Sequence, residues 1–361
     1  MYESVIKLGD VATYVNGYAF KPEDRGEEGL PIIRIQDLTG NSYDLGFYNG
    51  KYPEKIEIND GDVLISWSAS LGIYIWNRGK ALLNQHIFKV IFDKAAIDKK
   101  YFVYAVKHKL EEMISKTHGA TMKHIIKRDF DETLIPYPSE GVQKEIASNL
   151  DRVSGVIESQ EKELRLLDEL IKARFVEMFE NGSDENTYRL EEIADIVSGI
   201  TKGRKTKETE FREVPYMAVS NVKDGYIDWT TVKTILATED EIRQYKLMPN
   251  DVLMTEGGDP DKLGRGAIIS NPPEDCIHQN HIFRVRLDEK RVLPRYFSAY
   301  LQSPKAKKYF LKAAKQTTGI ASINMTQLRG LPTIIPTIDS QREYAEFCKQ
   351  VDKSKFMVMR W

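Results

Sequence analysis

The sequence contains two sets of matching segments in the same order, roughly 180 to 200 residues apart, a separation far longer than a solenoid repeat. KLGDVATYVNG from Lys7 matches RLEEIADIVSG from Arg189. LNQHIFKV from Leu83 matches HQNHIFRV from His278. Because the copies share one pattern of strands, turns and helices, the chain is predicted to fold into two similar units.

Further matches indicate that each unit is a mixed α/β structure. LPIIRIQDL from Leu30 and VPYMAVSNV from Val214 alternate apolar and polar residues, as a strand does. The Asp-Val-Leu segments that follow read as a turn feeding a buried strand. A Tyr-Phe pair then opens a helix in each copy, at Tyr101 and Tyr296. Ile135–Pro136 and Ile335–Pro336 are matched as the close of each copy.

A long helix is predicted from Gly141 to Phe179, after the first copy. One face of this helix carries residues at alternating steps of four and three, which makes a heptad seam on which only Gln160 and Arg174 are polar. From Ile146 to Met178 such a helix spans roughly 50 Å. An ordinary amphipathic helix on a globular core is the alternative interpretation. The seam residues are Ile146, Leu150, Val153, Ile157, Leu164, Leu167, Ile171 and Met178.

A second helix is predicted after the second copy, where Gln341–Arg342–Glu343 matches Gln143–Lys144–Glu145. The two helices are predicted to pair as an antiparallel coiled coil between the units. Residues 340–361 cover only roughly 33 Å, so we expect the first stripe to be exposed beyond about Leu164 unless a partner covers it. The seam residues of the second helix are Tyr344, Phe347, Val351 and Val358.

Composition limits the class of protein. A net charge of −2 counts against a stand-alone nucleic-acid binder, although local lysine clusters are compatible with DNA and equally with solvated helix faces. Two cysteines supply neither a disulfide framework nor a zinc site. Without a long apolar run or a secretion leader, the sequence predicts an intracellular protein with no membrane contact.

No motif predicts catalysis. Asn271–Pro272–Pro273 is followed by Glu274, where an adenine-gripping motif has an aromatic residue. No phosphate-binding Gly-x-x-x-x-Gly-Lys-Ser/Thr loop occurs. His86 and His281 lie in the best-matched segments; a base or phosphate contact is one reading, and a structural residue the favoured one. His278 and His281 are three residues apart, but only His281 is repeated and no carboxylate or third ligand accompanies them, so metal binding is not expected.

The ordered set of segments, followed by a heptad helix, resembles the specificity subunit of type I restriction-modification systems in both halves of the chain. The resemblance implies a non-catalytic, cytoplasmic subunit of a methyltransferase/endonuclease complex that reads a bipartite, asymmetric DNA target. It implies target recognition domains at 1–140 and 183–338. Helical regions at 141–182 and 339–361, the latter shorter than the resemblance implies, would space the domains and dock methyltransferases.

The same resemblance implies double-stranded DNA, methyltransferase (modification) subunits and restriction/translocase subunits as partners. S-adenosylmethionine, ATP and Mg are expected on those partners, and no cofactor in this chain. The alternative is a two-domain interaction scaffold on a coiled coil without a DNA role, which salt-dependent DNA binding would separate.

Candidate DNA contacts lie in the polar, Gly-containing loops of each copy. Base edges are read by amide, hydroxyl, imidazole and guanidinium groups, whereas lysines grip phosphate. A solvated side chain is the alternative at each position. The candidates of the first copy are Lys21, Thr121, Lys123, His124 and Lys127. Those of the second copy are Lys202, Arg204, Lys205, Lys312, Lys315, Ser322 and Asn324.

Overall fold

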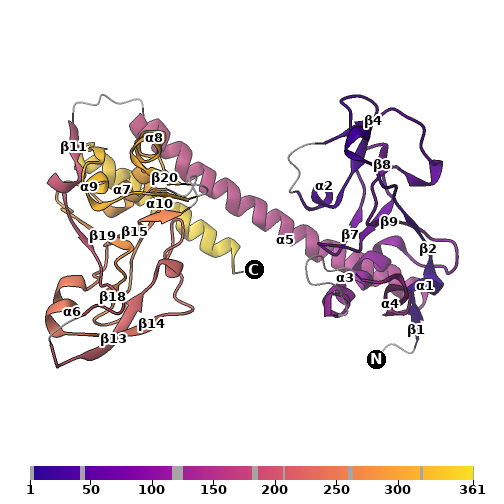
Figure 1. The fold of residues 1–361 in the computed structure, drawn as a ribbon, viewed down its shortest axis with the longest axis horizontal. Coiled ribbons are helices and arrows are strands. Elements are labelled where there is room, and N and C mark those ends of the chain that lie inside the picture. Colours follow the sequence, from indigo (N-terminus) through magenta and orange to yellow (C-terminus); the bar gives the residue numbers. More distant parts are fainter. Residues whose placement is uncertain are drawn as a thin grey trace. The chain divides into compact units, whose positions relative to one another are not determined.

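In the computed structural model (Figure 1), each half of the chain folds around an antiparallel four-stranded sheet. The structure describes residues 4–40, 45–115, 125–180, 186–205, 208–258, 263–317 and 320–360. It divides into unit 1, residues 1–159, and unit 2, residues 160–361. The mixed α/β fold predicted from the sequence is confirmed.

Unit 1 contains two four-stranded sheets. The main sheet has the order β2-β9-β6-β7, with all neighbours antiparallel, and the second has the order β4-β3-β8-β5, in which β3 and β8 are parallel. The strands of the main sheet are β2 (Thr13–Asn16), β6 (Val63–Ser66), β7 (Gly72–Ile75) and β9 (Ile87–Ile91). Those of the second sheet are β3 (Leu30–Ile33), β4 (Phe47–Tyr48), β5 (Glu57–Ile58) and β8 (Ala81–Leu83).

Unit 1 is closed by the short pair β1 (Val5–Lys7) and β10 (Leu134–Pro136), which brings the two ends of the first copy together. Apolar side chains of the main sheet pack against α3 in one buried cluster that includes Val63, Val90 and Phe102. The helices are α1 (Leu8–Val11), α2 (Ile35–Thr39), α3 (Lys99–Ser115), α4 (Lys127–Asp131) and the first part of α5 (Glu140–Phe175), with short 3-10 turns at Pro22–Asp24 and Glu54–Ile56.

Unit 2 repeats the main sheet with the order β12-β19-β15-β17. Each strand therefore has a counterpart in unit 1 at the same place, as the duplication predicts. The strands are β12 (Ala194–Ser198), β15 (Val252–Thr255), β17 (Gly266–Ile268) and β19 (Ile282–Leu287). Beside them lie β13 (Arg212–Met217), β14 (Lys233–Ala237) and β18 (Ile277–His278), the closing pair β11 (Thr187–Arg189) and β22 (Pro332–Ile334), and the small sheet of β16 (Gly257–Gly258), β20 (Lys315–Thr317) and β21 (Ile320–Ser322).

The helices of unit 2 include α10, which follows β22 as α5 follows β10 in unit 1. They are α6 (Glu239–Tyr245), α7 (Pro294–Leu301), α8 (Pro304–Ala313), α9 (Met325–Arg329) and α10 (Ile338–Val358), with the end of α5 and a π-helical turn at Val176–Glu180. Short 3-10 turns occur at Leu190–Glu192 and Val219–Asn221.

The duplication extends to single backbone contacts. Tyr18 N–H donates to Leu83 O, and Ile200 N–H donates to His278 O, each over 2.8 Å. The preceding residue is glycine in both copies. A Cβ on Gly17 would lie 2.0 Å from a carbonyl oxygen, and one on Gly199 would lie 1.9 Å from another. Only glycine allows this approach, which explains why the sequence repeats it.

The matched glutamines are also equivalent in the structure. Gln143 and Gln341 are buried near the start of α5 and α10. The Gln143 side chain accepts from Asp98 N–H and donates to Pro138 O, both over 2.9 Å. The Gln341 side chain accepts from Leu293 N–H over 2.8 Å and donates to Pro336 O over 2.9 Å. Each amide therefore ties its helix to the loop that precedes α3 or α7.

The end of α5 belongs to unit 2, where it packs beside α10 (Figure 1). The rings of Phe175 and Tyr344 lie 5.6 Å apart, and Arg174 pairs with Glu343 over 2.7 Å. Lys355, further along α10, pairs with Asp168, earlier in α5. Contacts that advance along one helix and retreat along the other define an antiparallel pair.

The expectation that the first stripe is exposed beyond about Leu164 is wrong. Leu164, Leu167, Ile171 and Met178 are all half-buried in unit 2. The reason is that α5 ends, and α10 begins, in the same apolar core, so the antiparallel pairing starts from the end of α5. On α10, Tyr344 and Val351 are buried, and Phe347 and Val358 are half-buried.

The exposed part of the predicted α5 seam lies in unit 1 instead. Ile146 packs against the unit 1 core, but Leu150, Val153 and Ile157 are 37%, 56% and 50% exposed. Their assignment to a coiled-coil seam stays a prediction, because it requires a partner that covers them.

Candidate nucleic-acid interface

Several loops of unit 1 meet at one end of the main sheet, which we call the loop end. Trp67, directly after β6, donates its N–H to His86 O over 3.2 Å. Its own carbonyl accepts from Ile125 N–H over 3.1 Å. Gln85 N–H donates to Tyr18 O over 2.8 Å. The loops after β2 and after β6 are therefore anchored to the turn that precedes β9, and the segment before α4 is anchored to the loop after β6.

Unit 2 has a loop end with the same backbone bonds. Glu256 N–H donates to His281 O over 3.0 Å, and Ile323 N–H donates to Glu256 O over 2.8 Å. Asn280 N–H donates to Ile200 O over 3.0 Å. The two loop ends therefore share a scaffold in which Trp67 corresponds to Glu256 and His86 to His281.

The side chains at the unit 1 loop end form an aromatic cluster. The Trp67 ring lies 4.9 Å from the His86 ring and 5.7 Å from the Phe88 ring, and its indole N–H donates to Asn16 Oδ1 over 3.2 Å. His86 has a φ of +70°, an uncommon value outside glycine that recurs at functional sites. Lys127 Nζ lies 5.8 Å from the centre of the Phe88 ring, so a cation borders the cluster.

The side chains at the unit 2 loop end are polar. His281 Nδ1 lies 2.5 Å from Glu256 Oε2, and both side chains are partly exposed. The small sheet places Ser322 opposite Gly257 on one side and opposite Lys315 on the other. Ser198 donates its hydroxyl to Asn280 O over 2.6 Å. This surface offers carboxylate, imidazole and hydroxyl groups, which suit hydrogen bonding to base edges.

The candidate DNA contacts of the first copy are placed in part. Thr121, Lys123 and His124 lie outside the described residues, although Ile125, which follows them, is anchored at Trp67. Lys127 borders the aromatic cluster and pairs with Asp131 over 2.9 Å. Lys21 is exposed, in the loop that starts from Tyr18.

In the second copy, the structure brings Ser322, Asn324 and the backbone of Lys315 to the loop end. Asn324 caps α9, since its side-chain oxygen accepts from Gln327 N–H over 2.9 Å. Lys202 and Lys205 are exposed in the loop after Ile200, and Lys312 is exposed in the last turn of α8.

Arg204 is held by other protein groups. Its guanidinium pairs with Glu241 through two nitrogens and donates to Leu236 O over 3.1 Å. The hydrogen bond that Arg204 donates to Glu241 holds the pKa of the Glu241 carboxyl below its ordinary value. A contact from Arg204 to DNA stays a prediction, and it requires Arg204 to exchange this partner.

Trp67 and Glu256 were not among the residues selected from the sequence. Aligning GDVLIS with NDVLMT places them opposite each other, but an unlike pair gives no chemical signal by itself. The two histidines were interpreted as structural residues. In the structure, His86 lies beside Trp67 and His281 beside Glu256, two equivalent positions with different side chains.

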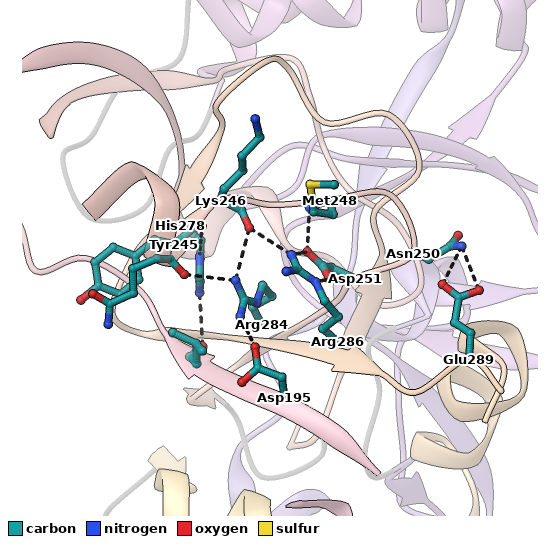
Figure 2. A network of polar contacts seen from close by, with 12 residues as sticks. Asp195, Tyr245, Lys246, Met248, Asn250, Asp251, His278, Arg284, Arg286 and Glu289 are labelled. Carbon is teal, nitrogen blue, oxygen red and sulfur yellow. Dashed lines mark hydrogen bonds and ion pairs between the residues drawn. The ribbon is translucent and has the colours of Figure 1, made fainter. Parts of the chain in front are cut away.

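A polar network links the unit 2 strands β12, β15 and β19 (Figure 2). Arg286 pairs with Asp251 through two bonds of 2.7 and 2.8 Å, and Asp251 also accepts from Met248 N–H over 2.7 Å. Arg284 donates to Gln244 O over 3.2 Å and pairs with Asp195.

His278 belongs to the same network, with its ring nitrogens 3.1 and 3.3 Å from carbonyl oxygens, and burial lowers its pKa to about 4. In unit 1, Lys89 pairs with Asp62 over 2.9 Å. These groups are bonded to one another, so the network serves the fold.

In the described part of the chain, no group of three or more His, Cys, Asp or Glu residues is placed to hold a metal ion. Among the same residues, no helix is long and apolar enough to cross a membrane. The two units therefore repeat one backbone scaffold, with an aromatic cluster at the loop end of unit 1 and polar side chains at the loop end of unit 2.

The model of the type I restriction modification DNA specificity domain matches residues 2–168 and again residues 182–359. The chain belongs to this family and carries two copies of its domain.

Curated relatives include the specificity subunit of the type I restriction enzyme EcoBI from Escherichia coli, 24% identical over 379 residues that cover 96% of this chain and 78% of the relative. Another is the MjaVIII specificity subunit from Methanocaldococcus jannaschii, 24% identical over 96% of this chain and 85% of the relative.

A crystal structure of the type I restriction-modification S subunit from M. genitalium has the same fold. It superimposes with a TM-score of 0.56 at 15% identity, covering 99% of this chain and 91% of that one. A chain from a structural study of complex assembly and conformational transition of the type I system gives 0.54 at 16% identity, covering 99% and 92%.

Proposed function

We propose that this chain is the non-catalytic DNA specificity subunit of a type I restriction-modification complex, and that each loop end reads one half of a bipartite, asymmetric target. The observation that carries the proposal is the repeated loop end. One backbone scaffold occurs twice, with an aromatic cluster at Trp67 in one copy and a carboxylate–imidazole pair at Glu256 in the other. Two similar but unlike readers give an asymmetric target.

In this proposal, residues 1–140 and 183–338 are the target recognition domains, and residues 141–182 and 339–361 are the helical spacer. The partners are double-stranded DNA, methyltransferase subunits and restriction/translocase subunits, in the cytoplasm. The specificity subunit selects the DNA sequence, while the partner subunits bind S-adenosylmethionine, ATP and Mg and carry out the reactions.

Lys21, Lys127, Lys312 and Lys315 are assigned to phosphate, because a flexible ammonium group neutralises backbone charge without reading sequence. The other candidates, Thr121, Lys123, His124, Lys202, Lys205, Ser322 and Asn324, are assigned to base edges. Arg204 joins them on release from Glu241.

The exposed face of α5 in unit 1 is assigned to docking of a methyltransferase subunit. Val153 and Val156 are each 56% exposed and Ile157 is 50% exposed, on neighbouring turns of one helix. Exposed apolar groups gathered in this way mark a protein interface.

The deciding experiment co-expresses the chain with its modification subunits and maps methylated adenines by long-read sequencing. We expect one split motif with two different halves. A methylome without any split motif would refute the proposal. Salt-dependent DNA binding by the assembled complex, measured by anisotropy, separates the proposal from the scaffold alternative, since a scaffold without a DNA role would bind none.

A further inference from the structure

The two loop ends carry different side chains at one pair of equivalent positions, Trp67 in unit 1 and Glu256 in unit 2, and in each unit this residue is bonded to a histidine, His86 or His281. The backbone bond between the two residues is the same in both, 3.2 Å from Trp67 N to His86 O and 3.0 Å from Glu256 N to His281 O. The backbone therefore holds both side chains at the loop end whatever their chemistry.

We infer that the Glu256–His281 pair is a base-reading element of unit 2, and that it selects a base with an exocyclic amino group in the major groove, cytosine N4 or adenine N6. This inference rests on the proposed function and names the readers within it. At the equivalent position of unit 1, Trp67 supplies an aromatic face where unit 2 supplies a carboxylate.

The first argument is electrostatic. A carboxylate at a DNA-facing surface is repelled by phosphate, so it needs a partner that carries a donor. At base edges, the carboxylate of a Glu or Asp accepts a hydrogen bond from an amino group of the base. Ser322 and the Lys315 backbone lie next to Gly257, so Glu256 is set among groups assigned to DNA and is itself partly exposed.

The second argument is positional. His281 Nδ1 lies 2.5 Å from Glu256 Oε2, and in the tautomer that carries the Nδ1 proton the ring donates to that oxygen. This bond uses one carboxylate oxygen and orients the side chain. Among the described residues no donor is bonded to Oε1, which leaves an oriented acceptor for a base amino group.

The unit 1 pair has different chemistry. The indole N–H of Trp67 is used by Asn16, and its ring packs on His86 and Phe88. An aromatic face has no acceptor for an amino group, and it suits apolar contact such as that with the thymine methyl group. The two positions therefore specify different bases from one scaffold.

The test uses the co-expressed complex and the methylome as readout. Glu256→Gln keeps the shape of the side chain but replaces one acceptor oxygen by a donor. We expect methylation at sites that differ at a single position of one half of the motif to rise about tenfold or more, since a good base contact contributes roughly 1–3 kcal/mol of discrimination. The base that is relaxed, cytosine or adenine, identifies the amino group.

A second variant, His281→Gln, keeps a donor that can reach Glu256 at an exposed position. We expect a smaller relaxation at the same position of the same half. Glu289→Gln is the matched control, because it alters a carboxylate bonded to Asn250 beyond the opposite end of β19, and it should leave the motif unchanged.

Wild-type discrimination in both variants, or relaxation spread over both halves of the motif, would overturn the inference while the proposed function stands. The absence of a split motif from the wild-type methylome would instead remove the proposed function itself. The half of the motif that is read by unit 1, which carries no substitution, serves as an internal standard within each sample.

Discussion

Gln341 links α10 to unit 2, and its replacement by leucine gives a prediction that the structure sets in detail. The side chain is fully buried. Its oxygen accepts from Leu293 N–H over 2.8 Å, and its nitrogen donates to Arg291 O and Pro336 O, each over 2.9 Å. Leucine has a similar size but no polar atom, so Gln341→Leu leaves one donor and two acceptors without this partner.

Each buried group left unpaired costs about 1–3 kcal/mol, and water reaches some of these half-buried loop residues. We therefore expect Gln341→Leu to destabilise the attachment of α10 by about 2–5 kcal/mol. Gln143→Leu is the matched variant in unit 1, where the side chain makes two such bonds, to Asp98 N and Pro138 O. It should cost about 1–3 kcal/mol by the same reasoning.

Hydrogen–deuterium exchange with mass spectrometry measures the effect in each unit separately, which a single unfolding curve of a two-unit chain does not. In Gln341→Leu, amides in residues 290–297 and 337–345 should exchange about 30-fold faster or more, which corresponds to about 2 kcal/mol. Unit 1 amides should keep their wild-type rates. Exchange of the two unit 2 segments within about threefold of wild type would refute the reasoning.

Three other predictions concern the duplication, pH and docking. Gly17→Ala and Gly199→Ala place a Cβ 2.0 and 1.9 Å from carbonyl oxygens, so hydrogen–deuterium exchange should show a loss of about 3 kcal/mol or more in the unit that carries the change. Gly155→Ala, with open space on α5, should instead gain about 0.5–1 kcal/mol. Burial lowers the pKa of His278 to about 4, so between that value and its ordinary 6.5 the unfolded chain binds more protons, and stability should fall as pH drops through this window, by about 1.4 kcal/mol per unit. His278→Leu should flatten that dependence in urea titrations at pH 7 and pH 4.5. Val153→Glu with Val156→Glu should abolish co-elution with the methyltransferase subunit without lowering the melting temperature, since both side chains are exposed, and unchanged co-elution would remove the docking assignment.

The sequence predicts the fold well where a residue type is required by a contact. Gly17 and Gly199 match because a close backbone approach excludes any side chain, and Gln143 and Gln341 match because each amide joins the same two loops. A requirement of this kind persists in both copies and is therefore visible as a repeat.

Matches without such a requirement are less reliable. Pairing Ile135–Pro136 with Ile335–Pro336 is two residues out of register, since Pro138 and Pro336 are the residues whose carbonyls accept from the matched glutamines. The Ile-Pro dipeptide is shared by coincidence, whereas the register is set by the strand ladder and the helix tie. The length of the second helix likewise led to a wrong prediction of which segment of α5 is covered. Spacing alone does not tell where along α5 an antiparallel partner begins.

The side chains of the loop ends could not be predicted from the repeat, for the opposite reason. Backbone hydrogen bonds fix the positions of these residues, so their side chains are free to differ. The interior keeps its chemistry. Asp62 accepts from Asn59 N–H over 2.8 Å and pairs with Lys89, while Asp251 accepts from Met248 N–H over 2.7 Å and pairs with Arg286.

At the loop end, by contrast, the same backbone bond holds a tryptophan in one unit and a glutamate in the other. Because the main-chain hydrogen bonds carry the geometry, exchanging these side chains changes the chemistry presented to a ligand at little cost to the sheet. A duplicated domain built in this way acquires two specificities from one fold, and the positions that match worst between its copies are the ones to test first for recognition.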